Sequence, residues 1–390
     1  MFDFDEVIDR RGTHSVKWDM METLFGVSPR DGLAMWVADM DFRPPPAVTS
    51  ALRAEIAQGV SGYFGDDRAY KTAITGWMRR RHRWEVDPDA ILTTHGLVAA
   101  VGFCLQAFSA PGDGVILFTP VYHAFHRIVR ANGRRIVESP LVEHEGRYLM
   151  DLDALAARLT GGERIVIFCS PHNPGGRVWS VEEQRALAAF CEAHDLILLS
   201  DEIHHDLLLH GSRHTPMTLA APEVASRLVM LTATTKTFNI AGALTGNAIV
   251  PDPGLRARLA AVLVAAGGGP NRFGVLMATA AYAEGDDWLD ELVAYLSENA
   301  RIFDRGVTAI PGLRSMPLEA TYLSWVDFAG TGMEAAEFTD RVGQGARIAA
   351  FKGPVFGTGG ESFMRFNIGT RRAVVLEAVA RLQQAFADLQ

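Results

Sequence analysis

Residues 164–200 read RIVIFCSPHNPGGRVWSVEEQRALAAFCEAHDLILLS. The stretch opens and closes with short apolar runs, Arg164–Cys169 and Leu196–Ser200, which have the length and composition of buried strands. Between them, Val181–His194 has the spacing of an amphipathic helix. A strand, a helix and a second strand in this order predict two parallel strands joined by a helix that covers one face of their sheet.

The same alternation extends from about residue 90 to residue 250. Further buried strands are expected at Ala90–Thr94, Gly114–Phe118, Leu228–Thr232 and Asn247–Val250, and further helices at Leu97–Ser109 and after Tyr122. Continuous apolar runs are typical of strands that are buried on both faces. The sequence therefore predicts an α/β fold with a mostly parallel sheet covered by helices, and ligands bind such sheets at the carboxyl ends of the strands.

The two ends of the chain have a different pattern. The expected C-terminal elements are helices at Asn271–Ala283, Trp288–Ile310, Ala335–Arg341 and Ala373–Leu389, and strands at Tyr322–Phe328 and Phe363–Ile368. The first 45 residues look irregular and end in prolines that interrupt both helix and sheet. We expect them to pack with the C-terminal portion. This predicts a large domain of residues 46–285 and a smaller α+β domain made from residues 1–45 and 286–390.

Composition restricts the classes of partner. The formal net charge of −9 argues against nucleic acid and against an anionic membrane surface. The basic run Arg79–Arg83 follows a helical pattern at Leu52–Trp77, so a solvated helix end is the simpler interpretation. No run approaches the roughly 18 apolar residues of a membrane span.

The cysteines and the N-terminus bear on location. Cys104, Cys169 and Cys191 lack C-x-x-C spacing and stand in apolar surroundings, which predicts buried free thiols in a reducing compartment. The N-terminal residues are acidic and lack the apolar core of a signal peptide. We therefore expect a cytoplasmic protein.

Lys236 is the residue that points to chemistry. Only four of the 37 Lys and Arg residues are lysines, and this one stands in a small, hydroxyl-bearing and apolar stretch, Thr234–Gly242. An amine that is partly removed from water has a lowered pKa and is nucleophilic near neutral pH. Such an amine condenses with aldehydes, of which pyridoxal 5'-phosphate (PLP) is the commonest biological case. The alternative is an ordinary loop lysine.

Four strand ends carry residues that suit such a cofactor. Gly96 opens a helix whose free N–H groups suit an anion, and Tyr122 has a flat ring for stacking. Asn173 lies between two prolines, and Asp201 directly follows an apolar strand, where its carboxylate needs a cation such as a protonated pyridine nitrogen. Each has a simpler alternative: a junction without a ligand, a core aromatic, a turn asparagine and a helix N-cap. Their joint occurrence in chain order, ending at the lysine, is the specific signal.

With these residues, the chain resembles the fold-type-I PLP-dependent enzymes of the class I/II aminotransferase superfamily. It is most similar to the MalY/PatB-type cystathionine β-lyases, which are carbon–sulfur lyases. The resemblance covers essentially the whole chain, and its most specific parts are residues 35–42, 200–204 and 236–242. Wider aminotransferases usually have Tyr where this chain has His204, and the lyase-like group has His.

The resemblance implies a role for each site residue. Lys236 is the catalytic residue, which binds PLP covalently and transfers protons. The implied cofactor-binding residues are Gly96, Leu97 and Val98 with Thr234 and Thr235 at the phosphate, Tyr122 against the ring, Asp201 at the ring nitrogen, Asn173 at the ring hydroxyl with His204 nearby, and Tyr63 from the neighbouring subunit. The implied substrate-binding residues are Val37, Ala38 and Arg365, of which Arg365 holds the substrate carboxylate.

The resemblance also implies an activity and an assembly. The expected reaction is α,β-elimination of S-substituted cysteines to a thiol, pyruvate and ammonia, in a homodimer with shared active sites. An aminotransferase using the same residues is the first alternative, and a regulatory protein on the same fold is the second. The superfamily arginine at the phosphate is replaced by Leu244, which leaves the phosphate charge without its usual partner. His204, His205, His210 and His214 match no familiar zinc spacing, so no metal site is expected.

Overall fold

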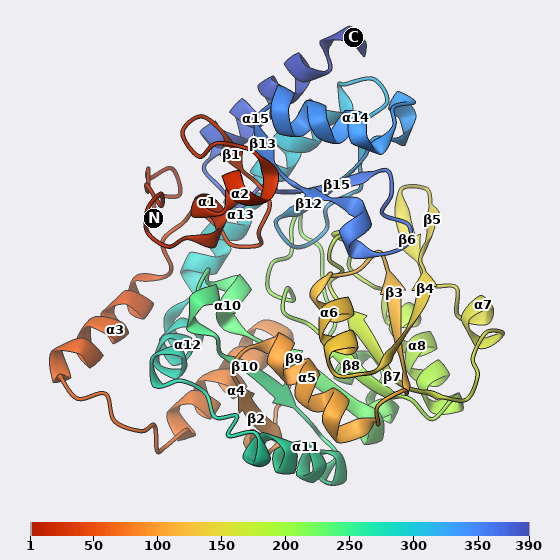
Figure 1. The fold of residues 1–390 in the computed structure, drawn as a ribbon. Helices are drawn as coiled ribbons and strands as arrows, with labels where there is room; N and C mark the ends of the chain where they lie inside the picture. Colours follow the sequence, from red (N-terminus) through yellow and green to blue (C-terminus); the bar gives the residue numbers. More distant parts are fainter. Residues whose placement is uncertain (1, 390) are drawn as a thin grey trace.

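The computed structural model describes residues 2–389, and its largest element is a seven-stranded sheet (Figure 1). In spatial order the strands are β2 (Ile91–Thr94), β10 (Gly246–Ile249), β9 (Leu228–Thr232), β8 (Ile197–Asp201), β7 (Glu163–Cys169), β3 (Gly114–Thr119) and β4 (Arg135–Pro140). The pairs from β9 to β4 are parallel, and β10 runs antiparallel to both β2 and β9. The prediction of an α/β fold with a mostly parallel sheet is confirmed.

Helices cover both faces of this sheet, as the composition of the strands requires. In β7, Val166 and Phe168 face one apolar core, and Ile165 and Ile167 face a second one on the opposite side. The first core is closed by α3 (Pro46–Gln58), α4 (Arg68–His82), α8 (Val181–Ala193) and α12 (Arg272–Glu284). The second is closed by α5 (Leu97–Phe108), α6 (Ala124–Ala131) and α11 (Pro253–Ala265). Every residue of β3 and β9 is buried as a result.

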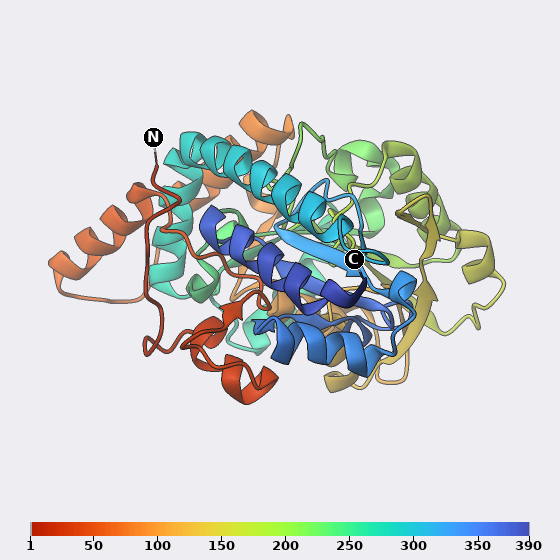
Figure 2. The same ribbon diagram turned by 90° about the horizontal axis from the view of Figure 1, so that it is seen from above.

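A smaller antiparallel sheet lies above the large one. Its strands, in spatial order, are β11 (Arg314–Ser315), β12 (Leu323–Asp327), β15 (Phe363–Asn367) and β14 (Phe351–Lys352). Two long helices, α13 (Asp286–Thr308) and α15 (Arg372–Ala385), pack side by side over it (Figure 2). The predicted helix at residues 335–341 is α14 (Ala335–Asp340), which runs into a wider turn at Arg341–Gly345.

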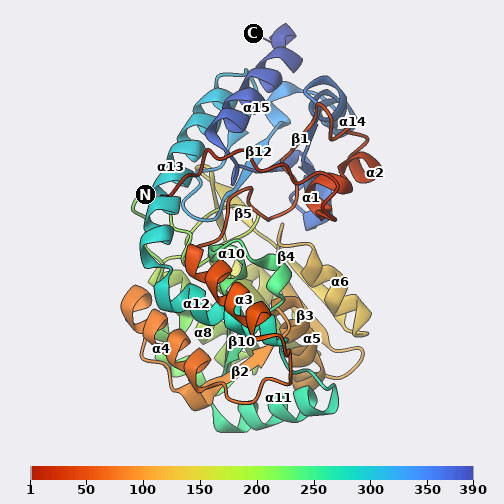
Figure 3. The ribbon, with the colours of Figure 1, turned by 90° about the vertical axis from the view of Figure 1, so that its left-hand side faces the viewer.

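The N-terminal segment lies against this C-terminal part. It contains α1 (Val16–Asp19), α2 (Met21–Phe25) and β1 (Leu33–Ala34), and β1 pairs in parallel with β13 (Ile348–Ala349). Figure 3 shows α1, α2 and β1 beside the C-terminal helix α14, although the two termini themselves lie apart. The contact that the prolines suggested is present, whereas the domain boundaries at residues 45/46 and 285/286 stay a prediction.

Four parts of the fold differ from the expectation. The helical pattern at Leu52–Trp77 is interrupted, since α3 ends at Gly59 (φ 83°) and residues 59–67 form a non-helical connection that projects from the body (Figure 1). Strand β4 was not expected because it is a largely half-exposed edge strand with few apolar residues. Helix α11 and the hairpin β5–β6 (Val142–His144, Arg147–Leu149) were not expected either.

The remaining short helices connect these elements. They are α7 (Leu152–Ala156), α9 (Met217–Ala220) and α10 (Thr234–Thr237), with turns of 3-10 helix at Pro88–Ala90, Pro222–Arg227, Ala241–Ala243, Ala329–Thr331, Gly353–Phe356 and Ala387–Leu389. Helix α10 is a single turn that directly follows β9, and it carries Lys236. The three cysteines are buried and free.

Candidate active site

A cavity of about 190 Å³ lies at the carboxyl ends of the strands of the large sheet. Its wall is formed by Ala38, His95, Gly96, Leu97, Val98, Ala99, Tyr122, Cys169, Asn173, Asp201, Ile203, His204, Thr235, Lys236, Ala241 and Leu244. Most of the residues singled out in the sequence therefore meet in one place. The location follows from the parallel strands, whose carboxyl ends open at the same edge of the sheet.

Lys236 reaches into this cavity from α10. Its Nζ donates a hydrogen bond of 2.5 Å to the main-chain carbonyl of Ala38, in the N-terminal segment. Burial lowers the pKa of Lys236 to about 8, although the carboxylates of Asp39 and Asp201 act in the opposite direction. About a tenth of this amine is consequently unprotonated at pH 7, far more than for an ordinary lysine, and the unprotonated form is the nucleophile.

Asp201 lies at the end of β8 in the same cavity. Its carboxylate accepts a hydrogen bond of 3.1 Å from the main-chain N–H of Ile203. Burial raises the pKa of Asp201 to about 7, and the neighbouring Glu202 adds to the rise. A carboxyl group held in this way would ionise fully only beside an additional cation.

The N-terminus of α5 forms another wall. Gly96 adopts a φ of 90°, a conformation that favours glycine, and the twelve-residue helix begins at the next residue. Across the cavity, the hydroxyl of Thr234 is buried without a hydrogen-bond partner, and Thr235 lines the wall. Free main-chain N–H groups and unpartnered hydroxyls are the groups that bind a phosphate. Leu244 is 59% exposed and lines the same cavity.

Tyr122 and His204 complete the cavity wall. His204 is buried and its Nδ1 has no hydrogen-bond partner. Burial lowers the pKa of His204 to about 3, helped by the cations of Lys236 and Arg365, so this imidazole is neutral. Burial also raises the pKa of the Tyr122 hydroxyl, which keeps the ring uncharged at neutral pH.

Arg365, on β15, lies next to the cavity rather than in its wall. Its Nη1 donates to Oδ1 of Asn173 and its Nη2 to the carbonyl of Trp36, both at 2.9 Å. The guanidinium packs over the rings of Phe356 and Phe351, and its Nε has no partner. Burial lowers the pKa of Arg365 to about 10, so it stays charged with donor capacity left for an anionic ligand.

Two groups of the site were missed from the sequence. The hydroxyl of Tyr322 donates at 3.0 Å to the Ala38 carbonyl that also accepts from Lys236. The side-chain amide of Asn367 donates to the carbonyls of Val37 and Asp39, both at 2.7 Å, and so fixes the segment around Ala38. Neither residue belongs to a polar motif. The sequence indicates only that Tyr322 lies next to a strand, β12, and that Asn367 ends another, β15.

Besides Arg365, three predicted residues lie outside the cavity wall. Thr234 is buried directly before the wall residue Thr235, and Val37 precedes Ala38 in the same way. Tyr63 is different, because it is completely exposed in the projecting connection between α3 and α4. Within a single chain the structure therefore does not bring Tyr63 to the cavity.

No helix among residues 2–389 is long and apolar enough to cross a membrane.

Comparisons with known proteins agree with this geometry. The chain matches the family described as "Aminotransferase class I and II" over residues 31–382. It is 41% identical to cystathionine beta-lyase PatB of Bacillus subtilis (strain 168), over 98% of this chain and 100% of that protein. It is 30% identical to protein MalY of Escherichia coli (strain K12), over 99% of each chain.

The fold is also similar to solved structures. Cystalysin from Treponema denticola, whose structure contains a pyridoxal 5'-phosphate cofactor, superimposes with a TM-score of 0.95 at 34% identity, covering 100% of both chains. The family match, the full-length relatives and the superposition all extend over nearly the whole chain. The chain therefore belongs to the class I and II aminotransferase family.

Proposed function

We propose that this protein is a PLP-dependent carbon–sulfur β-lyase that acts on S-substituted cysteines. The observation that carries the proposal is the pair formed by Lys236 and Asp201. Both face one cavity, and the pKa of each is moved towards neutrality, to about 8 and about 7. A perturbed amine and a perturbed carboxyl group facing one cavity are typical of a catalytic site.

The residues present fit the cofactor. Among residues 2–389 no cation is bonded to the buried carboxyl group of Asp201, and a protonated ring nitrogen would supply one. The unpartnered hydroxyl of Thr234 and the start of α5 suit a phosphate. The ring of Tyr122 and the amide of Asn173 line the space between these two ends of the cavity.

Each residue would then have a defined part in binding. Gly96, Leu97 and Val98 would hold the phosphate with Thr234 and Thr235, Tyr122 would lie against the ring, Asn173 and His204 would lie at its hydroxyl side, Asp201 at its nitrogen, and Lys236 at its aldehyde. Lys236 is the only Lys or Arg among the described residues that form the cavity wall. The phosphate charge would therefore be balanced by helix N–H groups and by any group of a second subunit.

The chain's own residues account for the steps of the reaction. Arg365 has a free Nε and a charged guanidinium, so it would bind the substrate carboxylate and orient the amino acid. The unprotonated amine of Lys236 would remove the Cα proton. When bound, PLP supplies the electron sink that makes this proton acidic. The imidazole of His204, which lines the cavity, is neutral and therefore adds no charge to the site.

The lyase activity is supported by the named relatives. PatB is named a cystathionine beta-lyase and matches this chain over its full length. Proton removal at Cα followed by loss of a sulfur substituent at Cβ, with one water consumed, yields a thiol, pyruvate and ammonia. A substrate with no leaving group at Cβ would lack this route.

The test is to assay the purified, PLP-loaded protein with cystathionine and a panel of S-substituted cysteines. Release of thiol and pyruvate in equal amounts, without a keto-acid acceptor, is expected. An aminotransferase would instead need the acceptor and would convert it to a new amino acid, and that result would contradict the lyase proposal. A colourless protein that binds no PLP would favour a regulatory role on this fold.

We also propose a homodimer that shares its active sites. Tyr63 is completely exposed, and Val60 in the same projecting connection is 66% exposed. Such residues in a protruding segment are suited to burial against a second copy, where Tyr63 would approach the neighbour's phosphate. A cytoplasmic location is proposed from the unpaired cysteines.

A further inference from the structure

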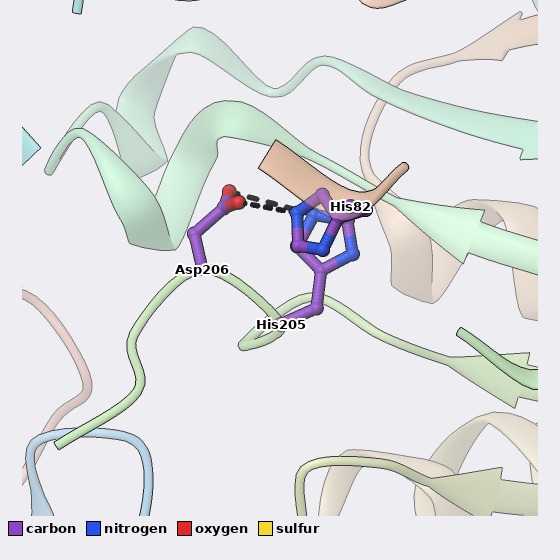
Figure 4. Close-up of side chains that lie close together, drawn as sticks. All are labelled: His82, His205 and Asp206. Carbon is purple, nitrogen blue, oxygen red and sulfur yellow. Dashed lines mark hydrogen bonds and ion pairs between the residues drawn. The ribbon is translucent and has the colours of Figure 1, made fainter. Parts of the chain in front are cut away.

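A buried polar cluster is formed by His205 and Asp206, which closely follow Asp201 in the chain, and by His82, at the end of α4. Figure 4 shows both imidazoles beside the carboxylate. The Nε2 atoms of His82 and His205 lie 2.7 Å and 3.4 Å from the oxygens of Asp206. The two rings lie against each other with their centroids 4.2 Å apart. Charged groups are seldom buried so completely without a role.

The spacing of these groups would permit a metal ion, but the hydrogen bonds argue against one. The ligand atoms of His82, His205 and Asp206 lie within 4.8 Å of one another. However, Oδ1 of Asp206 also accepts from Nε1 of Trp77 at 3.0 Å, and Oδ2 accepts from Oγ1 of Thr237 at 2.8 Å. A carboxylate has about four lone-pair positions, and three hydrogen bonds and the ion-pair contact with His205 already face those of Asp206. The described residues therefore surround this carboxylate fully without a metal ion.

His205 supplies the positive charge of this cluster. It lies between the carboxylates of Asp206 and Glu202, at 3.4 Å and 3.9 Å. Although burial opposes its charge, these two carboxylates raise the pKa of His205 to about 9. Burial lowers the pKa of His82, so that ring is neutral. Asp206 is accordingly an ionised carboxylate with a buried counter-ion, and His205 holds its pKa well below the usual range.

Glu202 anchors the other side of His205. Its carboxylate accepts from Ser200 Oγ at 3.0 Å and from the main-chain N–H of Met217 at 2.9 Å, and Nε2 of His214 lies 2.8 Å away. The cluster is thereby fixed to β8, the strand that ends in Asp201. The cluster therefore links α4 to β8 and is more than an isolated ion pair.

Asp206 connects this polar cluster to α10, the helix that carries Lys236. Thr237 is the last residue of α10 and the direct neighbour of Lys236. Helix α10 is one turn long and has no side-chain cap at its N-terminus. A single turn is unstable by itself, because its few hydrogen bonds do not offset the entropy of ordering it. The bond from Thr237 to a carboxylate, which is stronger than a neutral one, is therefore an important anchor of the turn.

We propose that Asp206 is a positioning residue, which holds Lys236 in its desolvated place by accepting the hydrogen bond of the Thr237 hydroxyl. The effect of Asp206 on catalysis rests on the proposed function, in which Lys236 is the catalytic residue. The effect of Asp206 on the position of the Lys236 amine does not, because it is already present in the cofactor-free protein. Two measurements distinguish the structural effect from the catalytic effect.

The first measurement uses the cofactor-free protein. Lys236 is acylated with an amine-reactive ester at a series of pH values, and its modification is followed on its own peptide by mass spectrometry. In Thr237→Val the hydroxyl is lost while the shape is kept. The freed amine becomes hydrated, so the pH midpoint of its modification should rise by about one unit towards that of an ordinary lysine. Thr237→Ser, which restores the hydroxyl, should return the midpoint to the wild-type value.

The second measurement uses the PLP-loaded protein. Misplacement of the amine should lower kcat about tenfold, while KM stays within about twofold because Arg365 is untouched. The matched control is Thr279→Val in α12. It removes a partly buried hydroxyl that donates to the main-chain carbonyl of Val275, in the same helix, at 2.8 Å. It should change neither the midpoint nor kcat. The substrate need not be a cysteine derivative for this comparison, since the loss in kcat is measured against wild type on whichever substrate is turned over.

An unchanged pH midpoint of Lys236 modification in Thr237→Val would refute the positioning role even if the lyase proposal holds. Equal effects of Thr237→Val and Thr279→Val would also refute it, since that pattern indicates general destabilisation. One equivalent of zinc in the purified protein, lost together with activity on chelation, would replace the hydrogen-bond network with a metal site. A raised midpoint without any carbon–sulfur cleavage would uphold the positioning role and reject only the lyase activity.

Discussion

The amine of Lys236 donates a 2.5 Å hydrogen bond to the carbonyl of Ala38, which lies 198 residues earlier in the chain. The same carbonyl accepts from the hydroxyl of Tyr322, on the C-terminal side. One main-chain oxygen thus joins the sheet, the N-terminal segment and the C-terminal part at the cavity. A bound cofactor would have to replace the bond from Lys236, and the Ala38 carbonyl would then keep its bond from Tyr322.

Replacing Lys236 with Ala should abolish turnover. The substitution removes both the nucleophilic amine and the proposed base for the Cα proton, and the rate of pyruvate release should fall by at least about 10³-fold. Borohydride reduction should then fix no cofactor to the chain. Lys71→Ala removes a lysine of α4 that pairs with Asp67 and should leave activity unchanged. Substantial lyase activity in the Lys236 variant would contradict the assignment.

Replacing Asp201 with Asn should stabilise the cofactor-free protein at high pH. The folded-state pKa of Asp201 is raised to about 7, above its ordinary value of 3.8, so its contribution to stability is complete below about pH 4 and is lost as the pH rises through 7. The wild type should lose on the order of 3 kcal/mol relative to the Asn variant between pH 5 and pH 8. Urea unfolding at both pH values measures the difference.

The control for this experiment is Glu85→Gln, which changes an exposed carboxylate. Its difference from wild type should be nearly independent of pH. PLP affinity should fall in Asp201→Asn, because the ring nitrogen loses its anionic partner. A pH-independent difference between Asp201→Asn and wild type would show that the carboxyl group is not desolvated as described.

Replacing His205 with Gln should remove a different pH dependence. Here the folded-state pKa is raised from 6.5 to about 9, so the contribution of the imidazolium is complete below about pH 6.5 and is lost as the pH rises through 9. The wild type should lose on the order of 3 kcal/mol across this window, and the variant should lack that loss. Unfolding of the cofactor-free proteins at pH 6 and pH 9.5 tests this, with His144→Gln, an exposed histidine, as the control.

Replacing Arg365 with Lys should weaken substrate binding. The planar guanidinium bonds Asn173 and Trp36 and packs over two phenylalanine rings, an arrangement that an ammonium group does not reproduce. We expect kcat/KM to fall about 100-fold, mostly through KM. Steady-state kinetics on one substrate measure it, and the half-exposed Arg301→Lys serves as the matched control. A normal KM would remove Arg365 from the carboxylate site.

Mixing two inactive variants should restore activity if active sites are shared. In a hybrid dimer of Lys236→Ala with Tyr63→Ala, one site carries both defects and the other carries none. Random exchange of subunits should therefore recover about a quarter of the wild-type activity, provided that the Tyr63 variant alone is severely impaired. Refolding each variant alone is the control. No recovery, or a fully active monomer in sedimentation, would contradict the shared site.

Much of the fold could be predicted because parallel strands are buried on both faces. Residues 228–232 are apolar except for the last one, and all of them are buried in β9. The direction of β10 could not be predicted, since an apolar run looks the same whether its strand is parallel or antiparallel. The interruption between α3 and α4 is not evident from the sequence, because the helical pattern continues past Gly59.

The candidate site could be predicted where its residues stand at strand ends. Asp201 is evident in this way, Lys236 is evident from its small and apolar surroundings, and both line the cavity. Ala38 was expected only from the family resemblance, and its bond to Lys236 was not expected. Tyr322 and Asn367 gave no local signal, because their roles depend on main-chain carbonyls that only the folded chain brings near.

Apolar periodicity and unpaired charges are local properties of the chain, so the buried strands and the polar groups that interrupt them can be recognised without the fold. The arrangement of Thr237, Trp77 and His82 around one carboxylate, Asp206, is visible only in the folded chain. The reason is that hydrogen bonds across 31 to 129 residues depend on how helices pack on the sheet, and no neighbouring residue in the sequence specifies that packing.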